Sequence, residues 1–406
     1  MIYVHVPFCR SFCTYCGFYS EAAPRCRRQE DILRQEALFE DYVKAVTAEA
    51  GARQDDIDRV FASDDADTLY IGGGTPSVLS LSAFDHILKA LGHDRPFAEF
   101  TIEVNPEDIV EKGPSYVRGL AGLGVNRVSM GVQSFDDGIL RFMNRRHSSA
   151  TAVEAYRILE AEGISNISID LIFGLPQLTD DLWEETLDKA LNISSTGMPP
   201  KHISAYQLSV ESGSMLERLI EKGKWEEADE RQCERQYSAL CSRLRDAGYH
   251  HYEISNFAQP GFEAVHNSAY WKHVPYVGLG PGAHSFIPCL QSGAKCGDRP
   301  WGERSIRRWN IENLQKYIQA GKEGDFTQVQ QQELLNDSQL ALEKVMLGLR
   351  TSAGLPEEQL RRYCRAGAVD AALVSGDLVP GKEGHLRIPE SRFFISDSII
   401  LNISDA

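Results

Sequence analysis

The stretch TLYIGGGTPSVLSLSAFDHILKALGHDRPFAEFTIEVNP, residues 68–106, decides the fold. Residues 68–71 form an apolar run that predicts a strand, and this strand breaks at a glycine-rich turn. Residues 82–91 have the spacing of a helix, and residues 100–104 predict a second strand that ends at Asn105. Strands that alternate with helices in this way are typical of a parallel sheet with crossover helices. The stretch therefore predicts an α/β fold.

The same alternation continues along much of the chain. Further strands are expected at residues 2–6, 127–132, 167–173 and 203–208. Further helices are expected at residues 31–51, 136–143, 151–162 and 180–193. Six strands, nearly all separated by helices, favour a full or partial (β/α) barrel whose active loops follow the C-terminal ends of the strands. Polar or glycine residues lie at or just after these ends: Cys9, Gly73, Glu103, Gln133 and Asp170.

The remainder of the chain has a different pattern. Residues 214–247 predict charged, solvated helices, and residues 249–286 are rich in glycine, aromatic residues and histidine. A polar segment follows, then expected helices at residues 330–350 and 355–366 and strand-like pieces at 386–388 and 393–395. This order predicts a small helix-plus-wing domain. The expected organisation is a barrel domain at residues 1–290, a linker at 291–325 and a small C-terminal domain at 326–406.

The composition disfavours a nucleic-acid-binding protein, a membrane-spanning protein and a secreted protein. The 406 residues carry a formal charge of −16, which argues against general binding to nucleic acid, because that binding relies on Lys and Arg. No apolar run reaches the roughly 18–20 residues of a membrane-spanning helix, and no signal peptide is visible. The nine cysteines are an odd number, so a reducing compartment without disulfides is expected. We therefore expect a cytoplasmic protein.

Three of the cysteines form a compact motif, Cys9-x3-Cys13-x2-Cys16. One interpretation is three incidental thiols. A second is a zinc site, but structural zinc takes four ligands, and neither His5 nor the distant Cys26 is an obvious fourth. A third is a 4Fe–4S cluster, in which three thiolates leave one iron open for a cofactor or substrate.

The cysteine motif, with Tyr15 inside it, and the stretch GGGTP at residues 72–76 resemble the signature of the radical S-adenosylmethionine (SAM) superfamily. The stretches IYVHVPFC, YIGGGTPS, IEVNPE, VSMGVQSF, NRRH and IDLIFGLP resemble its oxygen-independent coproporphyrinogen III oxidase group. Later stretches, YEISNFA, HNSAYW and GLGPGAHS, resemble the HemW-type haem chaperones of that group. The resemblance spans residues 1–401 and implies a partial (β/α) barrel of the radical SAM type.

This resemblance also implies cofactors and their residues. A 4Fe–4S cluster would be held by Cys9, Cys13 and Cys16, with SAM on the open iron. Tyr3 and His5 would line the cluster–SAM site, and Glu103 would bind the SAM amino group. The remaining SAM contacts implied are Gly73, Gly74, Thr75, Gln133, Arg145 and Asp170. Close approach of the backbone to the cofactor explains glycine at two of these positions.

Two departures separate the chain from the oxidases. Those enzymes carry a fourth cysteine two residues after the third, where this chain has Phe18, and an extension ahead of the motif. Both departures favour a haem chaperone that delivers haem to acceptors such as respiratory enzymes, with possible peripheral membrane contact. In that branch the motif His266-Asn267-x-x-Tyr270 is expected to mark haem handling, since imidazole is a common haem ligand. A purely structural role for His266 stays open.

Two other functions stay open. The first is a coproporphyrinogen III oxidase, which would remove carboxyl groups from propionate side chains. The second is a radical SAM enzyme of another substrate class, such as RNA modification, which the acidic composition disfavours.

Overall fold

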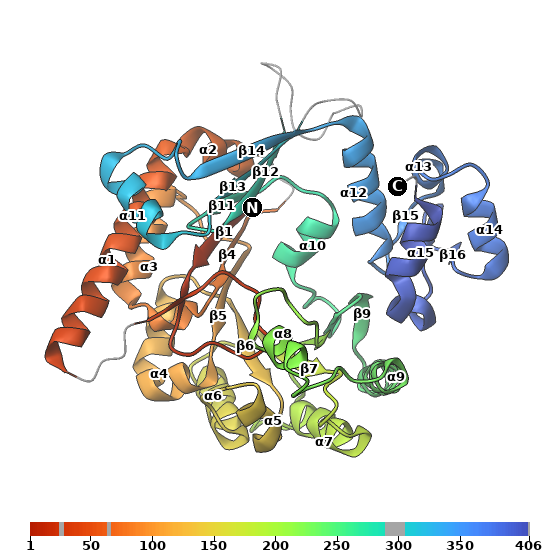
Figure 1. Ribbon diagram of the computed structural model, residues 1–406, viewed down its shortest axis with the longest axis horizontal. Coiled ribbons are helices and arrows are strands. Elements are labelled where there is room, and N and C mark those ends of the chain that lie inside the picture. Colours follow the sequence, from red (N-terminus) through yellow and green to blue (C-terminus); the bar gives the residue numbers. More distant parts are fainter. Residues whose placement is uncertain (24–27, 63–65, 289–304, 405–406) are drawn as a thin grey trace.

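The computed structural model describes residues 1–23, 28–62, 66–288 and 305–404. Its centre is a nine-stranded sheet in the order β11-β1-β4-β5-β6-β7-β8-β10-β9 (Figure 1). The run from β11 to β8 is parallel, and β10 and β9 add antiparallel strands at one edge. The six central strands are β1 (Ile2–Val6), β4 (Thr68–Gly73), β5 (Glu99–Val104), β6 (Arg127–Gln133), β7 (Ile167–Phe173) and β8 (His202–Gln207). The edge strands are β11 (Val277–Leu279), β10 (Asn256–Ala258) and β9 (His250–Glu253).

All six strands expected from the sequence are present, and the sheet is a partial barrel with helices on its outer face (Figure 1). The outer helices are α1 (Gln29–Ala52), α2 (Gln54–Ala62), α3 (Leu81–Leu91), α4 (Pro106–Gly122), α6 (Ser149–Ala161), α7 (Asp180–Leu191) and α9 (Glu230–Asp246). Shorter helices are η1 (Pro76–Val78), α5 (Asp137–Phe142), α8 (Met215–Glu221) and α10 (Val265–Trp271). Several begin at a side-chain cap; Ser80, for example, accepts from the Ala83 amide at the start of α3.

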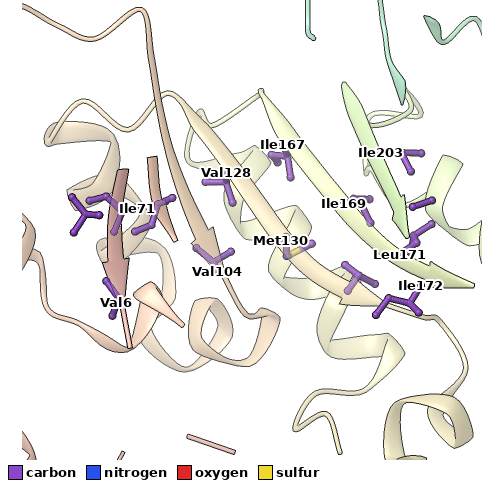
Figure 2. Packing of buried hydrophobic residues seen from close by; sticks show 14 of the residues in the cluster. Val6, Ile71, Val104, Val128, Met130, Ile167, Ile169, Leu171, Ile172 and Ile203 are labelled. Atoms are coloured by element: carbon purple, nitrogen blue, oxygen red, sulfur yellow. The ribbon is translucent and has the colours of Figure 1, made fainter. Parts of the chain in front are cut away.

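Alternation along the central strands places apolar and polar side chains on opposite faces of the sheet. Val128 and Met130 of β6, with Ile169 and Leu171 of β7, belong to the buried core shown in Figure 2. The residues between them, such as Asp170, line a cavity on the other face. The inner face of the sheet therefore forms a cavity with polar walls around Asp170. The hydrophobic core lies on the other face, between the sheet and the outer helices.

A linker was expected at residues 291–325, but the part of this segment that the structure describes is folded. Ser305–Asn310 is strand β13, which pairs with β12 (His284–Pro288) and β14 (Gln330–Leu335), and Leu314–Glu323 is helix α11, packed on α1. Residues 289–304 lie outside the described residues. A buried carboxylate explains the packing. Glu49 of α1 accepts hydrogen bonds from Asn310 Nδ2 at 2.9 Å and from the Tyr317 hydroxyl at 2.6 Å.

The C-terminal region is helical with a small wing, as the sequence predicts (Figure 1). Its helices are α12 (Asp337–Leu349), α13 (Glu357–Tyr363), α14 (Ala368–Ser375) and α15 (Ser396–Ile403). Its short strands are β15 (Leu355–Pro356), β16 (Val379–Pro380) and β17 (His385–Arg387). Two details differ from expectation. Residues 330–335 are strand rather than helix, and residues 393–395 belong to the 3-10 helix η2 (Glu390–Ile395).

The C-terminal region is joined to the barrel by hydrogen bonds to the edge strand β9 and to the residue that follows it. The Ser352 amide donates to the Tyr252 carbonyl at 2.9 Å, and the Ile254 amide donates to the Arg350 carbonyl at 3.2 Å. Within the described residues, no helix combines the length and apolar composition needed to cross a membrane.

Candidate cluster and cofactor site

A cavity of about 570 Å³ lies at the carboxyl ends of the central strands. Ten of the thirteen residues singled out in the sequence line it: Cys9, Cys13, Cys16, Gly73, Gly74, Thr75, Glu103, Gln133, Arg145 and Asp170. Tyr3, His5 and His266 do not. These ten residues therefore bring three thiols, two buried carboxyl groups and one guanidinium to a cavity whose wall holds further charged side chains.

The cysteine loop follows β1 directly. Short strands β2 (Phe8–Cys9) and β3 (Glu21–Ala22) pair and close it at its base. The Thr75 hydroxyl donates to Cys9 Sγ at 3.6 Å, and Arg145 Nη1 donates to Cys13 Sγ at 3.4 Å. The three thiols face one cavity, are free of disulfides, and receive donors suited to thiolate sulfur. This donor set fits an iron–sulfur cluster with one corner left open.

Burial raises the pKa of Cys9, and it raises the pKa of Cys16 to about 11. Both thiols therefore stay protonated in the metal-free protein at neutral pH. Metal binding requires thiolate, so iron would displace these protons as it binds.

Gly73 and Gly74, at the end of β4, stand too close to β1 and to Phe8 for either to carry a side chain. A Cβ at Gly74 would lie 2.7 Å from the Phe8 carbonyl oxygen, one residue before Cys9. Gly73 has a φ of +112°, and a Cβ there would lie 2.6 Å from the His5 ring. Glycine is therefore required at both positions, because the end of β4 touches the strand that carries the cysteine loop.

Glu103, at the end of β5, is held beside these glycines. Its carboxylate accepts a hydrogen bond from the Tyr70 hydroxyl at 2.7 Å and one from the Gly73 amide at 3.0 Å. Burial raises the pKa of Glu103 to about 7. Among the described residues no cation forms an ion pair with it. A buried carboxylate at a cavity wall without a cation suits a ligand that brings an ammonium group.

Asp170 and Arg145 also line the cavity. Asp170 accepts from the Ser129 hydroxyl at 2.9 Å, and burial raises its pKa to about 6. Arg145 Nη2 donates to Asn105 Oδ1 at 2.6 Å and to the Gly131 carbonyl at 2.7 Å. The buried Nε of Arg145 has no hydrogen-bond partner within the described residues. This unpaired donor suits an acceptor on a bound ligand.

Tyr3 and His5 lie behind the glycine turn rather than in this cavity. His5 Nε2 is 2.9 Å from the Tyr19 carbonyl oxygen, which only accepts, so Nε2 carries the proton. His5 Nδ1 therefore accepts from the Tyr3 hydroxyl at 3.0 Å. Both side chains line a second, smaller pocket.

His266 is also away from the cavity. Its Nδ1 is 2.7 Å from Thr68 Oγ1 and its Nε2 is 3.2 Å from the Tyr270 hydroxyl, so both ring nitrogens are engaged. The side chain is buried, and burial lowers its pKa to about 3. In this conformation the imidazole joins α10 to the start of β4. Its neighbour Asn267 does line the cavity.

Sequence reasoning missed several residues that line the cavity. Ser129 and Ser204 accompany Asp170, and Tyr206 stands at the end of β8. The period-2 alternation of the strands was the available signal, because it assigns these positions to the same face as the recognised residues.

Comparison with known proteins places this site in a family. The profile of the radical SAM superfamily matches residues 3–190. The heme chaperone HemW of Synechocystis sp. is 34% identical over 88% of this chain and 79% of its own length. The chain belongs to the HemW family of radical SAM proteins. The HemW protein of Bacillus subtilis is similarly related, with 31% identity over 90% of this chain and 87% of its own length.

The HemW family membership agrees with the recognition made from the sequence. Radical SAM proteins use a 4Fe–4S cluster and SAM, and these cofactors follow for this chain from the family. The fold matches the structure titled as coproporphyrinogen III oxidase (HemN) from Escherichia coli, a radical SAM enzyme, with a TM-score of 0.74. That match covers 100% of this chain and 89% of the other at 20% identity, so it establishes the shared fold.

Proposed function

We propose that this protein is a haem chaperone, which binds a 4Fe–4S cluster and SAM, holds haem and passes it to haem-requiring acceptor proteins. The observation that carries the proposal is the identity of 34% to a heme chaperone over 88% of the chain. The cavity supports it, since its three thiols, its glycine turn and Glu103 suit the two cofactors of the superfamily.

Cys9, Cys13 and Cys16 would hold the cluster in this proposal. Arg145 would stabilise negative charge on the Cys13 sulfur, and Thr75 would donate to that of Cys9. When bound together, the cluster and SAM supply one-electron chemistry. The chain's own residues bind and orient SAM: Glu103 would pair with its ammonium group, and the narrow turn at Gly73 and Gly74 would keep its methionine part beside the loop.

Further contacts are proposed for the rest of SAM. Arg145 presents an unpaired buried donor, Nε, to the cavity. Gln133 lies at an irregularity of β6 and has a φ of 67°, so the strand turns there at the cavity wall. Asp170 supplies acceptor oxygens for hydroxyl groups.

An oxidase function is the alternative. The shared fold with HemN permits it, but Phe18 provides no fourth thiol, and its side chain is 72% exposed. We further propose that the protein works in the cytoplasm, that its acceptors include respiratory enzymes, and that it contacts the membrane peripherally when it serves them. The charge of −16 supports a partner other than nucleic acid.

The test is anaerobic reconstitution with iron and sulfide, followed by titration with hemin, with and without SAM. The loaded protein is then mixed with apomyoglobin as a probe acceptor, and transfer is followed by the shift of the Soret band. We expect stoichiometric hemin binding and transfer. Absence of hemin binding, or release of CO2 from coproporphyrinogen III, would refute the chaperone function.

A further inference from the structure

Another group of metal-ligating side chains lies outside the cavity, where the C-terminal region meets the barrel. Cys241 of α9, His251 of β9 and Glu390 of η2 bring one donor atom each to the same place, and these three atoms lie within 4.8 Å of one another. Cys241 and His251 are buried, and Glu390 is half-buried. None of the three lines the cluster cavity, so the cofactors of the superfamily do not account for them.

The hydrogen bonds of His251 leave one ring nitrogen facing other acceptors. Its Nε2 is 3.2 Å from the Ile254 carbonyl oxygen, which only accepts, so Nε2 carries a proton. Nδ1 lies 3.2 Å from Glu390 Oε1 and 3.9 Å from Cys241 Sγ. A neutral ring would set the lone pair of Nδ1 against a carboxylate oxygen, so a positive centre is required between them. A second proton on the ring supplies it in the metal-free protein, and a metal ion can take the place of that proton.

The ring is already oriented for such a contact. A histidine that binds metal usually donates its other ring N–H to a backbone carbonyl, a carboxylate or water, and Nε2 of His251 does so to Ile254. Phe257 stacks on the imidazole with ring centroids 4.0 Å apart, and Phe393 of η2 meets it edge-on at 5.0 Å. The position of Nδ1 is therefore set from both sides of the junction.

The spacing of the donor atoms fits a tetrahedral ion. With bonds of about 2.3 Å to sulfur and about 2.0–2.2 Å to nitrogen and oxygen, zinc would hold its ligands roughly 3.3–3.7 Å apart. The separations of 3.9 Å and 3.2 Å from Nδ1 need only small shifts to reach this arrangement. A thiol, an imidazole and a carboxylate together favour Zn²⁺ over Mg²⁺ and Ca²⁺, which take oxygen ligands.

Arg245 is a competing cation at this group, but its contact leaves a carboxylate oxygen available. Its Nη2 donates to Glu390 Oε1 at 3.0 Å. Within the described parts of the chain, Glu390 Oε2 has no hydrogen-bond partner. Glu390 can therefore keep Arg245 on one oxygen and bind a metal ion with the other.

We propose that Cys241, His251 and Glu390 bind one zinc ion, with water as the fourth ligand. The ion would displace two protons, one from the Cys241 thiol and one from His251 Nδ1, so the net charge of the group would not change. Because the ligands belong to α9, β9 and η2, zinc would fasten the C-terminal region to the barrel. This inference goes beyond the proposed function and does not depend on haem.

The test is zinc binding by the full-length protein after reconstitution of its cluster, so that Cys9, Cys13 and Cys16 are already occupied. Bound zinc is measured by mass spectrometry after gel filtration, and its ligands by X-ray absorption at the zinc edge. We expect one zinc ion per chain with a single sulfur neighbour and otherwise nitrogen or oxygen. Three sulfur neighbours would place the zinc in the cysteine loop, and absence of retained zinc would leave only the protonated ion pair. Either result would overturn the proposal.

The variants are Cys241→Ser and Glu390→Gln, and Cys233→Ser is the matched control, because Cys233 is another buried cysteine of α9 and is not one of the three donors. Loss of a partner that only orients a metal ligand costs roughly 10–100-fold in affinity, so loss of a ligand should cost at least on the order of tenfold. Competition with a chromophoric chelator measures the affinity. Cys233→Ser should match the wild type, whereas wild-type affinity in both ligand variants would contradict the assignment.

Amide hydrogen exchange tests whether the ion fastens the junction. Zinc should slow exchange in η2 of the wild type and of Cys233→Ser, and it should leave exchange unchanged in Cys241→Ser. Glu390→Gln keeps the shape of a half-buried side chain, so it tests the site even if Cys241→Ser folds poorly. None of these measurements uses haem, so failure of the haem chaperone function would not be mistaken for failure of the zinc site.

Discussion

The Gly73 amide donates a hydrogen bond to Glu103 Oε2 at 3.0 Å and so ties the ends of β4 and β5 together at the cavity wall. The backbone of one strand thus positions the carboxylate of the next. Because Gly73 also packs against His5 of β1, three adjacent strands are fixed relative to one another at this point.

SAM binding should depend on the ionisation of Glu103. Burial raises the pKa of this carboxyl to about 7, so at pH 6 most of the ligand-free protein holds a neutral acid there. A ligand that pairs its ammonium group with the carboxylate should therefore bind more tightly as pH rises from 6 to 7.5. Equilibrium dialysis of SAM measures this. Glu103→Gln should weaken binding and remove the pH dependence, and a slope that persists in this variant would implicate another group.

A side chain at Gly74 should disturb the cysteine loop. The Cβ of Gly74→Ala would lie 2.7 Å from the Phe8 carbonyl oxygen, which is backbone and cannot rotate away. We expect lower SAM affinity and lower iron content after reconstitution, measured by dialysis and by iron and sulfide analysis. Gly122→Ala, in α4 with no atom within 4 Å of the new Cβ, is the control and should behave as the wild type. Full iron content and SAM affinity in Gly74→Ala would contradict the placement.

Cluster assembly should require the thiol of Cys13. We expect Cys13→Ser to lose most of the iron and the EPR signal of the reduced cluster, because an alkoxide is a poor substitute for thiolate. Cys233→Ser is the matched control, since Cys233 is a buried cysteine of α9 that does not line the cavity. Equal iron loss in both variants would point to general instability rather than ligation.

His266→Ala should act mainly on stability. The substitution leaves the buried hydroxyl of Thr68 and the half-buried hydroxyl of Tyr270 without their imidazole partner, and a buried group left unpaired costs about 1–3 kcal/mol. Urea unfolding measures the loss. Ligation of haem by His266 stays an untested prediction from the sequence. It would be supported if this variant lost the Soret band while its unfolding midpoint was unchanged.

The contact of η2 with the barrel should be sensitive to acid. The hydrogen bond with His251, together with Arg245, lowers the pKa of Glu390 to about 2. A depressed carboxyl pKa stabilises the fold above the unfolded value of about 4.3 and stops doing so as pH falls toward 2. Glu390→Gln should therefore lower the urea midpoint at pH 7 and have a smaller effect near pH 3. An equal effect at both pH values would contradict this assignment.

The central strands could be predicted because their signal is local. Ile2–Val6 and Ile167–Phe173 are short apolar runs that indicate strands by themselves, and each is followed directly by a proline or a glycine. The cavity followed from the rule that active residues stand at the carboxyl ends of parallel strands. The strand Ser305–Asn310 was missed because its polar residues gain their partners from Glu49 and other groups far away in sequence.

The positions of the histidines could not be predicted. HNSAYW and GLGPGAHS each offer an imidazole, and nothing local shows that His266 turns inward to Thr68 while His284 faces a pocket. The difference arises from tertiary pairing. His266 stands on a short helix over β4, and His284 begins a strand that leaves the main sheet.

The pairing of β1 with β11 bears on the order of events during synthesis. Val4 leaves the ribosome 275 residues ahead of its partner, Leu279. Until then the strand that leads into the cysteine loop has β4 on one side and an open edge on the other. Since chains begin to fold while they are being made, the loop cannot reach its final support before Leu279 has emerged. Iron should therefore enter only after Leu279 has emerged, and a nascent or truncated chain ending before Leu279 would present three cysteines on an unfinished sheet.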